Sequence, residues 1–203
     1  MLKKIKSSFF IRFLFFHLSE EIKLKIAKYN KLLQNKIDIN LNNYKLFRGR
    51  YIIYKEDGTA KEYNSFNDQL IFEGEYLNGK RNGKGREYYS SGKLKFEGEY
   101  LNGKRTGNGK EYDSMYELLN YEGEYLNGKR NGKGREYEKN HLSNLIFIGE
   151  YINGKKWNGK GYNNNNVIYE LKNGKGYIKE YKFNQLIFEG EYLNGEKNGK
   201  GKE

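Results

Sequence analysis

The fold is decided by a stretch that recurs along the chain, Phe72-Glu-Gly-Glu-Tyr-Leu-Asn-Gly-Lys-Arg-Asn-Gly-Lys-Gly-Arg-Glu-Tyr88. It returns as FEGEYLNGKRTGNGKEY from Phe96, YEGEYLNGKRNGKGREY from Tyr121, FIGEYINGKKWNGKGY from Phe147 and FEGEYLNGEKNGKGKE from Phe188. The first copies are about 24 residues apart, a period typical of repeat proteins, in which each unit buries its apolar face against its neighbours. The recurrence therefore predicts a repeat architecture.

Each copy has the pattern of a β-hairpin. Over residues 72–77, aromatic or glycine positions alternate with glutamate and leucine, and a period of two is typical of a strand. Asn78-Gly79 follows, a dipeptide that favours a type I′ turn because both central positions of that turn need a positive φ. A two-residue turn at this point places Leu77 opposite Lys80.

Continuing that register along both strands predicts the remaining cross-strand pairs. They are Tyr76 with Arg81, Glu75 with Asn82, Gly74 with Gly83, Glu73 with Lys84, and Phe72 with Gly85. We expect the Phe72 ring to cover Gly85, and a ring of the next unit to fill the hollow between Gly74 and Gly83. We also expect Tyr76 to stack on Arg81, a contact worth roughly 0.2–1 kcal/mol.

Composition and charge divide the chain into two parts. Hydrophobic residues make up 36% of the 203 residues and aromatic residues 16%, which favours a thin core of stacked rings over a thick globular one. The net charge is +12, but residues 1–46 hold ten basic and three acidic residues, whereas residues 47–203 hold 28 and 23. We therefore predict a basic helical segment over 1–46 and a nearly charge-balanced repeat domain over 47–203.

The pattern Tyr/Phe-Glu-Gly-Glu-Tyr-x-Asn-Gly-Lys-x-x-Gly-x-Gly resembles the MORN (membrane occupation and recognition nexus) repeat over residues 47–203. The resemblance implies a mostly β fold, an elongated twisted antiparallel meander of about seven β-hairpin repeats. It also implies a role as a scaffold, a dimerisation module or a tether near membranes. The linkers between units are longer than in many members, and are similar to those of related repeats in bacterial toxin-neutralising proteins.

The expected interaction surface is the aromatic–glycine face of the repeats, where we expect protein partners of unknown identity to bind. This face comprises Phe72, Gly74, Tyr76, Phe96, Gly98, Tyr100, Tyr121, Gly123, Tyr125, Phe147, Gly149, Tyr151, Phe188, Gly190 and Tyr192. The last unit stops at Glu203, one residue before its closing tyrosine is due. The unpaired strand this leaves predicts a homo-oligomer through the C-terminal edge; the alternative is a sequence cut short at that residue.

The N-terminal segment has helical periodicity. Ser19 is a good N-cap with Glu20 and Glu21 in the first turn. An apolar stripe at helical spacing follows: Leu18, Ile22, Ile26, Tyr29, Leu33 and Ile37. One interpretation is a small helical cap that packs on the first hairpin through this stripe.

Two other interpretations of the N-terminal segment stay open. As a basic amphipathic helix it would attach peripherally to anionic phospholipid. Its contacts would be Lys3, Lys4, Lys6, Phe9, Phe10, Arg12, Phe13, Lys23, Lys25 and Lys28. The stretch from Leu18 to Tyr29 also resembles the start of an F-box, which implies an adaptor for ubiquitin ligases. A secretory signal is disfavoured, because Arg12 interrupts the apolar run and no small-residue cleavage site follows it.

No residue pattern predicts chemistry, so we expect a non-catalytic protein without cofactor. The two histidines, His17 and His141, are far apart, and no metal-ligand or nucleophile–base spacing occurs. The chain has no cysteine, which excludes disulfides and thiolate metal sites and is compatible with a cytoplasmic location. Glutamate recurs beside lysine throughout the repeats, so a continuous nucleic-acid-binding stripe is not expected.

Overall fold

The computed structural model describes residues 8–16, 18–27, 31–36, 49–138, 144–182 and 185–202. The chain forms two compact units. One comprises Met1–Ile53 with Glu62–Gln69, and the other comprises Tyr54–Lys61 with Leu70–Glu203. The helical segment thus belongs to the first unit, and the repeats from Leu70 onward belong to the second.

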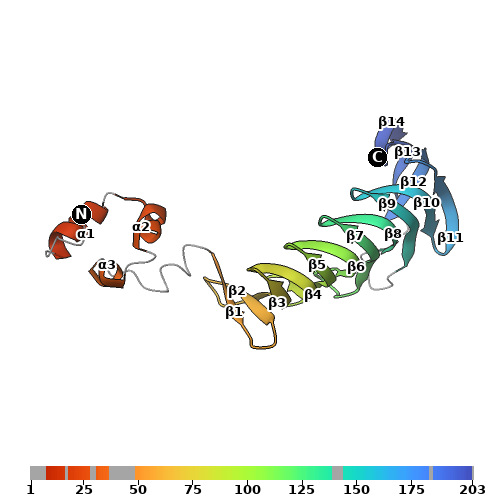
Figure 1. The fold of residues 1–203 in the computed structure, drawn as a ribbon. Helices are drawn as coiled ribbons and strands as arrows, with labels where there is room; N and C mark the ends of the chain where they lie inside the picture. Colours follow the sequence, from red (N-terminus) through yellow and green to blue (C-terminus); the bar gives the residue numbers. More distant parts are fainter. Residues whose placement is uncertain are drawn as a thin grey trace. The chain divides into compact units, whose positions relative to one another are not determined.

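In the part of the chain that the structure describes, fourteen strands follow one another in a meander of hairpins (Figure 1). They are β1 (Arg50–Tyr54), β2 (Thr59–Asn64), β3 (Leu70–Leu77), β4 (Lys80–Tyr88), β5 (Leu94–Leu101), β6 (Lys104–Tyr112), β7 (Leu119–Leu126), β8 (Lys129–Tyr137), β9 (Leu145–Ile152), β10 (Lys155–Asn163), β11 (Asn166–Leu171), β12 (Gly176–Lys182), β13 (Gln185–Leu193) and β14 (Glu196–Lys202). Strands β1–β11 form one sheet in chain order, and β12–β14 form a second. The predicted mostly β meander is therefore confirmed, except that it is divided between two sheets.

The predicted turn is confirmed. Asn78 and Gly79 have φ values of 50° and 73°, and the Asn-Gly pairs at 102–103, 127–128, 153–154 and 194–195 also have two positive values. Across the turn, Leu77 pairs with Lys80 and Tyr76 with Arg81, as predicted. Successive turns are also joined, since the amide of Gly103 donates to the Arg81 carbonyl at 2.8 Å and Gly128 donates to Arg105 at 2.9 Å.

Beyond these two pairs the predicted register is wrong. Gly74 pairs with Gly85 rather than Gly83, because β4 bulges between the pairs of Tyr76 and Gly74. The bulge contains Gly83, whose φ of 75° suits glycine. The four incorrect pairs are Glu75–Asn82, Gly74–Gly83, Glu73–Lys84 and Phe72–Gly85.

The side chain of Glu75 explains why the bulge forms. Its carboxylate lies against Gly83, and its Oε1 accepts a hydrogen bond from the Lys84 amide at 2.9 Å. The freed backbone donor thus has a partner within the hairpin. As a consequence, Glu73 faces Arg86 and Phe72 faces Glu87.

The core of the repeat unit is a chain of aromatic rings. Phe72, Phe96, Tyr121 and Phe147 are fully buried, and they alternate with the buried rings of Tyr100, Tyr125 and Tyr151. Each ring meets a ring of the next hairpin edge to face, with centroids 5.1 to 5.3 Å apart for the pairs Phe72–Tyr100, Phe96–Tyr125 and Tyr121–Tyr151. This geometry is favourable for aromatic quadrupoles, so the rings join each hairpin to its neighbour.

The later units depart from the pattern. Between its Asn-Gly turn and the next glycine, the hairpin that begins at Phe147 has one residue more than the earlier copies, and Trp157 forms a bulge there, because the register of β9 and β10 shifts between Lys156 and Asn158. The Asn163–Asn166 loop is a tight hairpin turn in which Asn164 and Asn165 both have positive φ. Strand β14 lies at an edge of the second sheet, and pairing of that edge with a second copy stays a prediction.

The described residues of the first unit form three short helices: α1 (Ser8–Phe16), α2 (Glu20–Ala27) and α3 (Lys31–Lys36). The predicted N-cap is confirmed, since Ser19 Oγ accepts from the Ile22 amide at 3.4 Å. The predicted apolar stripe is wrong in part. Ile22 and Ile26 are 45% and 42% exposed, and Tyr29 and Ile37 lie outside the described residues. The buried cluster instead comprises Ile11, Phe15, Leu24, Ala27 and Leu33, because the short helices pack on one another.

Candidate functional site

A row of glycines crosses eight strands of the long sheet. Its members pair with one another in sequence: Gly74, Gly85, Gly98, Gly109, Gly123, Gly134, Gly149 and Gly159. The row stops at β11, where Gly159 pairs with Leu171 and the sheet itself ends. The surface along this row is therefore bare backbone.

The aromatic core makes glycine necessary in this row. A Cβ on Gly109 would lie 2.4 Å from Cζ of Phe96, and one on Gly134 would lie 2.3 Å from the Tyr121 hydroxyl. Since both rings are fully buried, neither has space to move away. The rings thus lie against one side of the glycine row, and the other side stays open.

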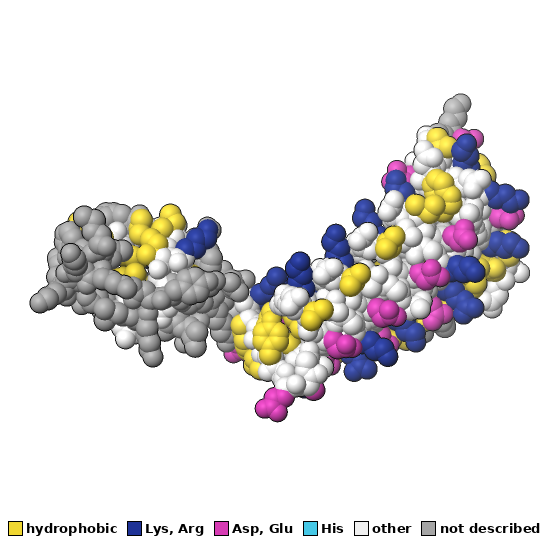
Figure 2. Space-filling model, viewed as in Figure 1, with side chains coloured by type: hydrophobic (Ala, Val, Ile, Leu, Met, Phe, Trp, Pro, Cys, Tyr) yellow, Lys and Arg dark blue, Asp and Glu magenta, His cyan; other side chains and the backbone are white. Residues whose placement is uncertain are grey.

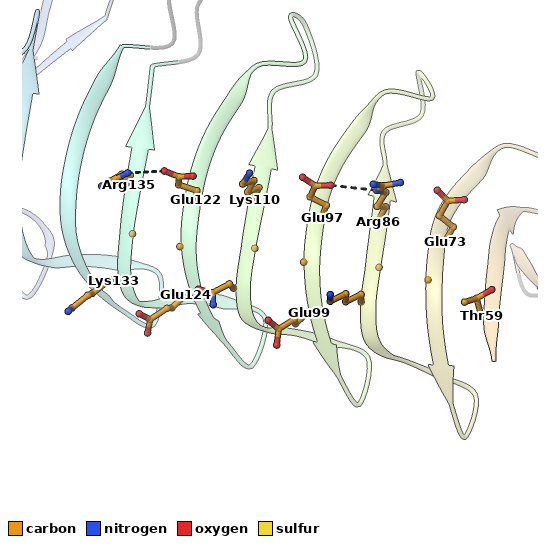
Figure 3. Close-up of a pocket in the computed structure, with 18 of the residues that line it drawn as sticks. Thr59, Glu73, Arg86, Glu97, Glu99, Lys110, Glu122, Glu124, Lys133 and Arg135 are labelled. Carbon is orange, nitrogen blue, oxygen red and sulfur yellow. Dashed lines mark hydrogen bonds and ion pairs between the residues drawn. The ribbon is translucent and has the colours of Figure 1, made fainter. Parts of the chain in front are cut away.

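A first charged row borders the glycines on this open side. It runs strand by strand through Glu73, Arg86, Glu97, Lys110, Glu122, Arg135, Ile148 and Lys160. Acidic and basic residues alternate as far as Arg135 (Figure 3). Ion pairs join Arg86 to Glu97 at 3.5 Å and Arg135 to Glu122 at 3.4 Å.

Tyrosines hold the carboxylates of the first charged row. The hydroxyl of Tyr88 donates to Glu73 at 2.5 Å, and that of Tyr112 donates to Glu97 at 2.7 Å. Burial and the adjacent carboxylate raise the pKa of Tyr88 to about 12, and the same causes apply to Tyr112. Both phenols therefore stay protonated and act as donors at neutral pH.

A second charged row borders the glycines on their other side. It comprises Glu75, Lys84, Glu99, Asn108, Glu124, Lys133 and Glu150. Glu99 and Glu124 lie against Gly107 and Gly132 as Glu75 lies against Gly83. All three carboxylates support the bulges, and those of Glu99 and Glu124 also line the groove (Figure 3).

One groove of about 1130 Å³ runs along the glycines between the two rows, from β2 and the turn before it to β9. Its lining contains seven acidic and seven basic side chains, and acidic and basic residues also intermingle over the repeat unit in Figure 2. A polyanion such as nucleic acid would meet as many like as unlike charges here. The groove suits a ligand that carries both signs of charge.

The opposite face carries a ladder of partly buried ion pairs above the rings. Arg105 bonds Glu87 at 2.8 Å and Glu111 at 2.9 Å, and Arg130 bonds Glu111 and, at 3.0 Å, Glu136. Arg105 also lies 3.9 Å above the ring centroid of Phe96. Burial opposes ionisation of Glu111, but Arg130 and Arg105 outweigh it and hold the pKa of Glu111 below its usual 4.5. The repeat pattern alone does not predict this ladder, because its ion pairs depend on the bulged register of the hairpins.

The predicted aromatic–glycine face is not a single exposed surface, and for its rings the prediction needs correction. Tyr76 and Tyr192 are half-buried, and all the other rings of that face are buried: Phe72, Phe96, Tyr100, Tyr121, Tyr125, Phe147, Tyr151 and Phe188. They are buried because neighbouring hairpins stack on them. Its glycines Gly74, Gly98, Gly123 and Gly149 do line the groove, whereas Gly190 is buried in the second sheet.

The proposed membrane contacts of the N-terminal segment are only partly described. Phe13 is 56% exposed on α1, and Lys25 is exposed and Lys23 half-exposed on α2. The side chains of Phe9, Phe10, Arg12, Lys3, Lys4, Lys6 and Lys28 lie outside the described residues. None of the helices described is long and apolar enough to span a bilayer, and the described residues hold no cluster of metal-ligating side chains.

The family model described as the MORN repeat matches residues 72–93, 96–116, 121–140 and 188–203. A search among curated proteins found no match. Among solved structures, the chain is similar to TarM and to a mutant of S. aureus TarM in complex with fondaparinux, α-GlcNAc-glycerol and UDP. Identity is 12%, the TM-score is 0.36, and the alignment covers 68% of this chain and 26% of TarM. The chain spans about a quarter of TarM, and so weak a likeness carries no functional argument.

Proposed function

We propose that this chain, four segments of which match the MORN repeat model, is a non-catalytic scaffold that holds an extended segment of a partner protein in its groove. The observation that carries this proposal is the continuous groove over β2–β9, with its floor of backbone and its two charged borders. A bound segment can approach the glycine floor closely and pair its own charges on both sides. The proposal includes no bound cofactor.

The width of the groove favours an extended segment over a helix. On each strand the two charged rows are two residues apart, as Glu73 and Glu75 are, which corresponds to about 7 Å. An α-helix with side chains is about 10–12 Å wide and would rest on the rows rather than between them. An extended backbone is narrow enough to reach the glycines.

The spacing of charge along the groove favours the same occupant. Like charges recur on every second strand, about 9.5 Å apart. Three residues of polyproline II span about 9.3 Å, whereas seven residues of α-helix, the nearest whole repeat, span about 10.5 Å. The six strand intervals from Gly74 to Gly149 amount to about 29 Å, enough for roughly nine residues of polyproline II.

The test is selection from a display library of random twelve-residue peptides on the intact protein. We expect selected peptides to bind the native protein and a Lys129→Trp variant alike, and to lose at least ten-fold in affinity for Lys110→Trp. Lys110 is exposed and lines the groove, so an indole there obstructs it; Lys129 is an equally exposed lysine at a hairpin turn outside the groove. Failure to select any peptide, or binding indifferent to Lys110→Trp, would contradict groove binding.

A second candidate function, peripheral attachment to an anionic membrane through the N-terminal helices, is favoured by their exposed apolar residues. Phe13 and Phe16 are 56% and 76% exposed, and Ile22 and Ile26 are exposed on α2 near Lys23 and Lys25. Apolar side chains beside lysines suit the interface of an anionic bilayer.

This candidate predicts that the intact chain floats with phosphatidylserine vesicles at low salt, less so at physiological salt, and that Phe13→Glu with Phe16→Glu abolishes flotation. Leu77→Glu with Leu101→Glu, at exposed positions of the repeats, is the matched control and should leave flotation unchanged. Equal loss in both variants, or no flotation at all, would count against the N-terminal helices as an anchor.

A further inference from the structure

The alternation of charge in the groove is interrupted at two positions. In the first charged row Ile148 stands where the preceding hairpins have Glu73, Glu97 and Glu122. In the second charged row Asn108 stands where the hairpins on either side have Lys84 and Lys133. Both positions line the groove.

Each interruption leaves two like charges facing a neutral side chain. Ile148 pairs with Arg135 of β8 on one side and with Lys160 of β10 on the other, so two cations flank a position without a carboxylate. Each cation has an acidic neighbour on the side away from Ile148: Glu122 bonds Arg135 at 3.4 Å, and Glu170 of β11 pairs with Lys160. Ile148 and Arg135 line the groove and the exposed Lys160 lies on the next strand, so a carboxylate placed over Ile148 would meet a cation on either side.

The second interruption has the opposite sign. Asn108 on β6 pairs with Glu124 on β7, and the Glu99 carboxylate of β5 lies against the preceding residue, Gly107. The side chains of Asn108, Glu124 and Glu99 are all exposed. Two carboxylates therefore flank a position that holds a lysine in the neighbouring hairpins. This part of the groove attracts a cation.

We propose that these two interruptions fix the register of the bound segment, an inference that rests on the groove being the binding site. A carboxylate of the partner lies over Ile148 between Arg135 and Lys160. An ammonium or guanidinium group of the partner lies beside Asn108 between Glu99 and Glu124. With the partner in place, the alternation of charge is complete along both rows, whereas any other register leaves these charges unmatched.

The geometry specifies the spacing of the two partner residues. Asn108 lies on β6 and Ile148 on β9, three strand intervals or about 14 Å apart along the groove. At about 3.1 Å per residue, an extended segment covers this distance in four or five residues. Polyproline II has three residues per turn, so separations of four or five also direct the two side chains to different sides, as the two rows require.

The test uses synthetic twelve-residue proline-rich peptides that contain one Lys and one Glu, separated by two to eight residues in either order. Binding to the intact protein is measured by fluorescence anisotropy at 20 mM and 300 mM salt. At low salt we expect separations of four and five to bind about three- to ten-fold tighter than separations of two, three or eight, since two exposed ion pairs supply the difference. High salt should remove most of this preference.

Variants of the protein identify the source of the preference. Ile148→Glu with Asn108→Lys restores the alternation of the other hairpins and should abolish the dependence on separation. Val167→Glu with Asn166→Lys makes the same change of charge at exposed positions of β11 outside the groove, and should leave it intact.

The outcomes separate this inference from the proposed function. Equal affinity at all separations, or a preference that survives Ile148→Glu with Asn108→Lys, overturns the register while the groove remains the binding site. The register is also overturned if no charged peptide binds better than a neutral proline-rich peptide. If the groove is not the binding site, the display selection shows it independently, because no selected peptide then loses affinity for the Lys110→Trp variant.

Discussion

Replacing Phe96 by alanine is expected to lower the free energy of unfolding by about 3–5 kcal/mol, the range for truncation of a buried aromatic residue. The Phe96 ring is fully buried, meets the rings of Tyr100 and Tyr125 edge to face, and lies beneath the Arg105 guanidinium. Its loss leaves a cavity that joins two hairpins, and neither can close it alone. Urea unfolding followed by circular dichroism measures the change.

The same ring explains the glycine row, and a double-mutant cycle tests that explanation. Gly109→Ala alone should cost about 1–3 kcal/mol, because the new methyl group overlaps the Phe96 ring. In the Phe96→Ala background that overlap is gone, so Gly109→Ala should cost much less. Leu101→Ala, at an exposed position of the same hairpin, is the control and should change stability by about 0.5 kcal/mol or less. Equal costs of Gly109→Ala in both backgrounds would show that ring packing does not impose the glycine.

Local features of the repeat could be predicted from the sequence because they depend on a few adjacent residues. The Asn-Gly pair determines the turn by its positive φ values, and the two-residue alternation determines the strands. The pairs next to the turn, Leu77 with Lys80 and Tyr76 with Arg81, follow directly. The recurrence then orders the hairpins along the sheet, since each unit needs its neighbours to bury its rings.

The register beyond the turn could not be predicted, because it depends on a side chain that bonds backbone on the other strand. Glu75 stabilises the bulge at Gly83, and an unbulged ladder is equally compatible with the sequence pattern. The predicted register assigns Lys84 to Glu73 as its cross-strand partner, whereas the structure pairs Glu73 with Arg86. The two charged rows therefore do not follow from the predicted register. The prediction that the rings form an exposed face is wrong for a similar reason. In a single hairpin that face is exposed to solvent, and the rings become buried only when neighbouring hairpins stack on them.

In the helical segment, periodicity predicted the N-cap correctly but not the buried side. Ser19 caps α2 through its own side chain, which is a local interaction. Ile22 and Ile26 share the expected face yet remain exposed, whereas Leu24 and Ala27 are buried. Helices of nine, eight and six residues bury whatever side meets their neighbours, and a single helical wheel does not contain that information.

Replacing Glu111 by alanine is expected to lower the free energy of unfolding by roughly 2–3 kcal/mol at pH 7, because it leaves two arginines without their shared partner. Glu111 bonds Arg105 at 2.9 Å and also bonds Arg130, and all three side chains are about one-fifth exposed or less. Breaking a fully buried ion pair lowers the free energy of unfolding by more than this. The expected value is smaller for Glu111 because its side chain and those of the two arginines remain partly exposed. Unfolding in urea again measures the effect, and Glu117→Ala is the control. Glu117 is half-exposed, and its ion pair with Lys93 at 3.5 Å should contribute less than about 1 kcal/mol.

The pH dependence separates the charge of Glu111 from its packing. The pKa of Glu111 is lower in the folded protein than its usual 4.5, so its ionised form stabilises the fold above pH 4.5 and that contribution is lost as the pH falls through the lowered value. The difference in stability between the native protein and Glu111→Gln should therefore be largest near pH 7 and should shrink steadily below pH 4.5. A difference that stays constant down to pH 3 would assign the role of Glu111 to hydrogen bonding and shape alone, and the ladder would then hold the hairpins together without any contribution from its charge.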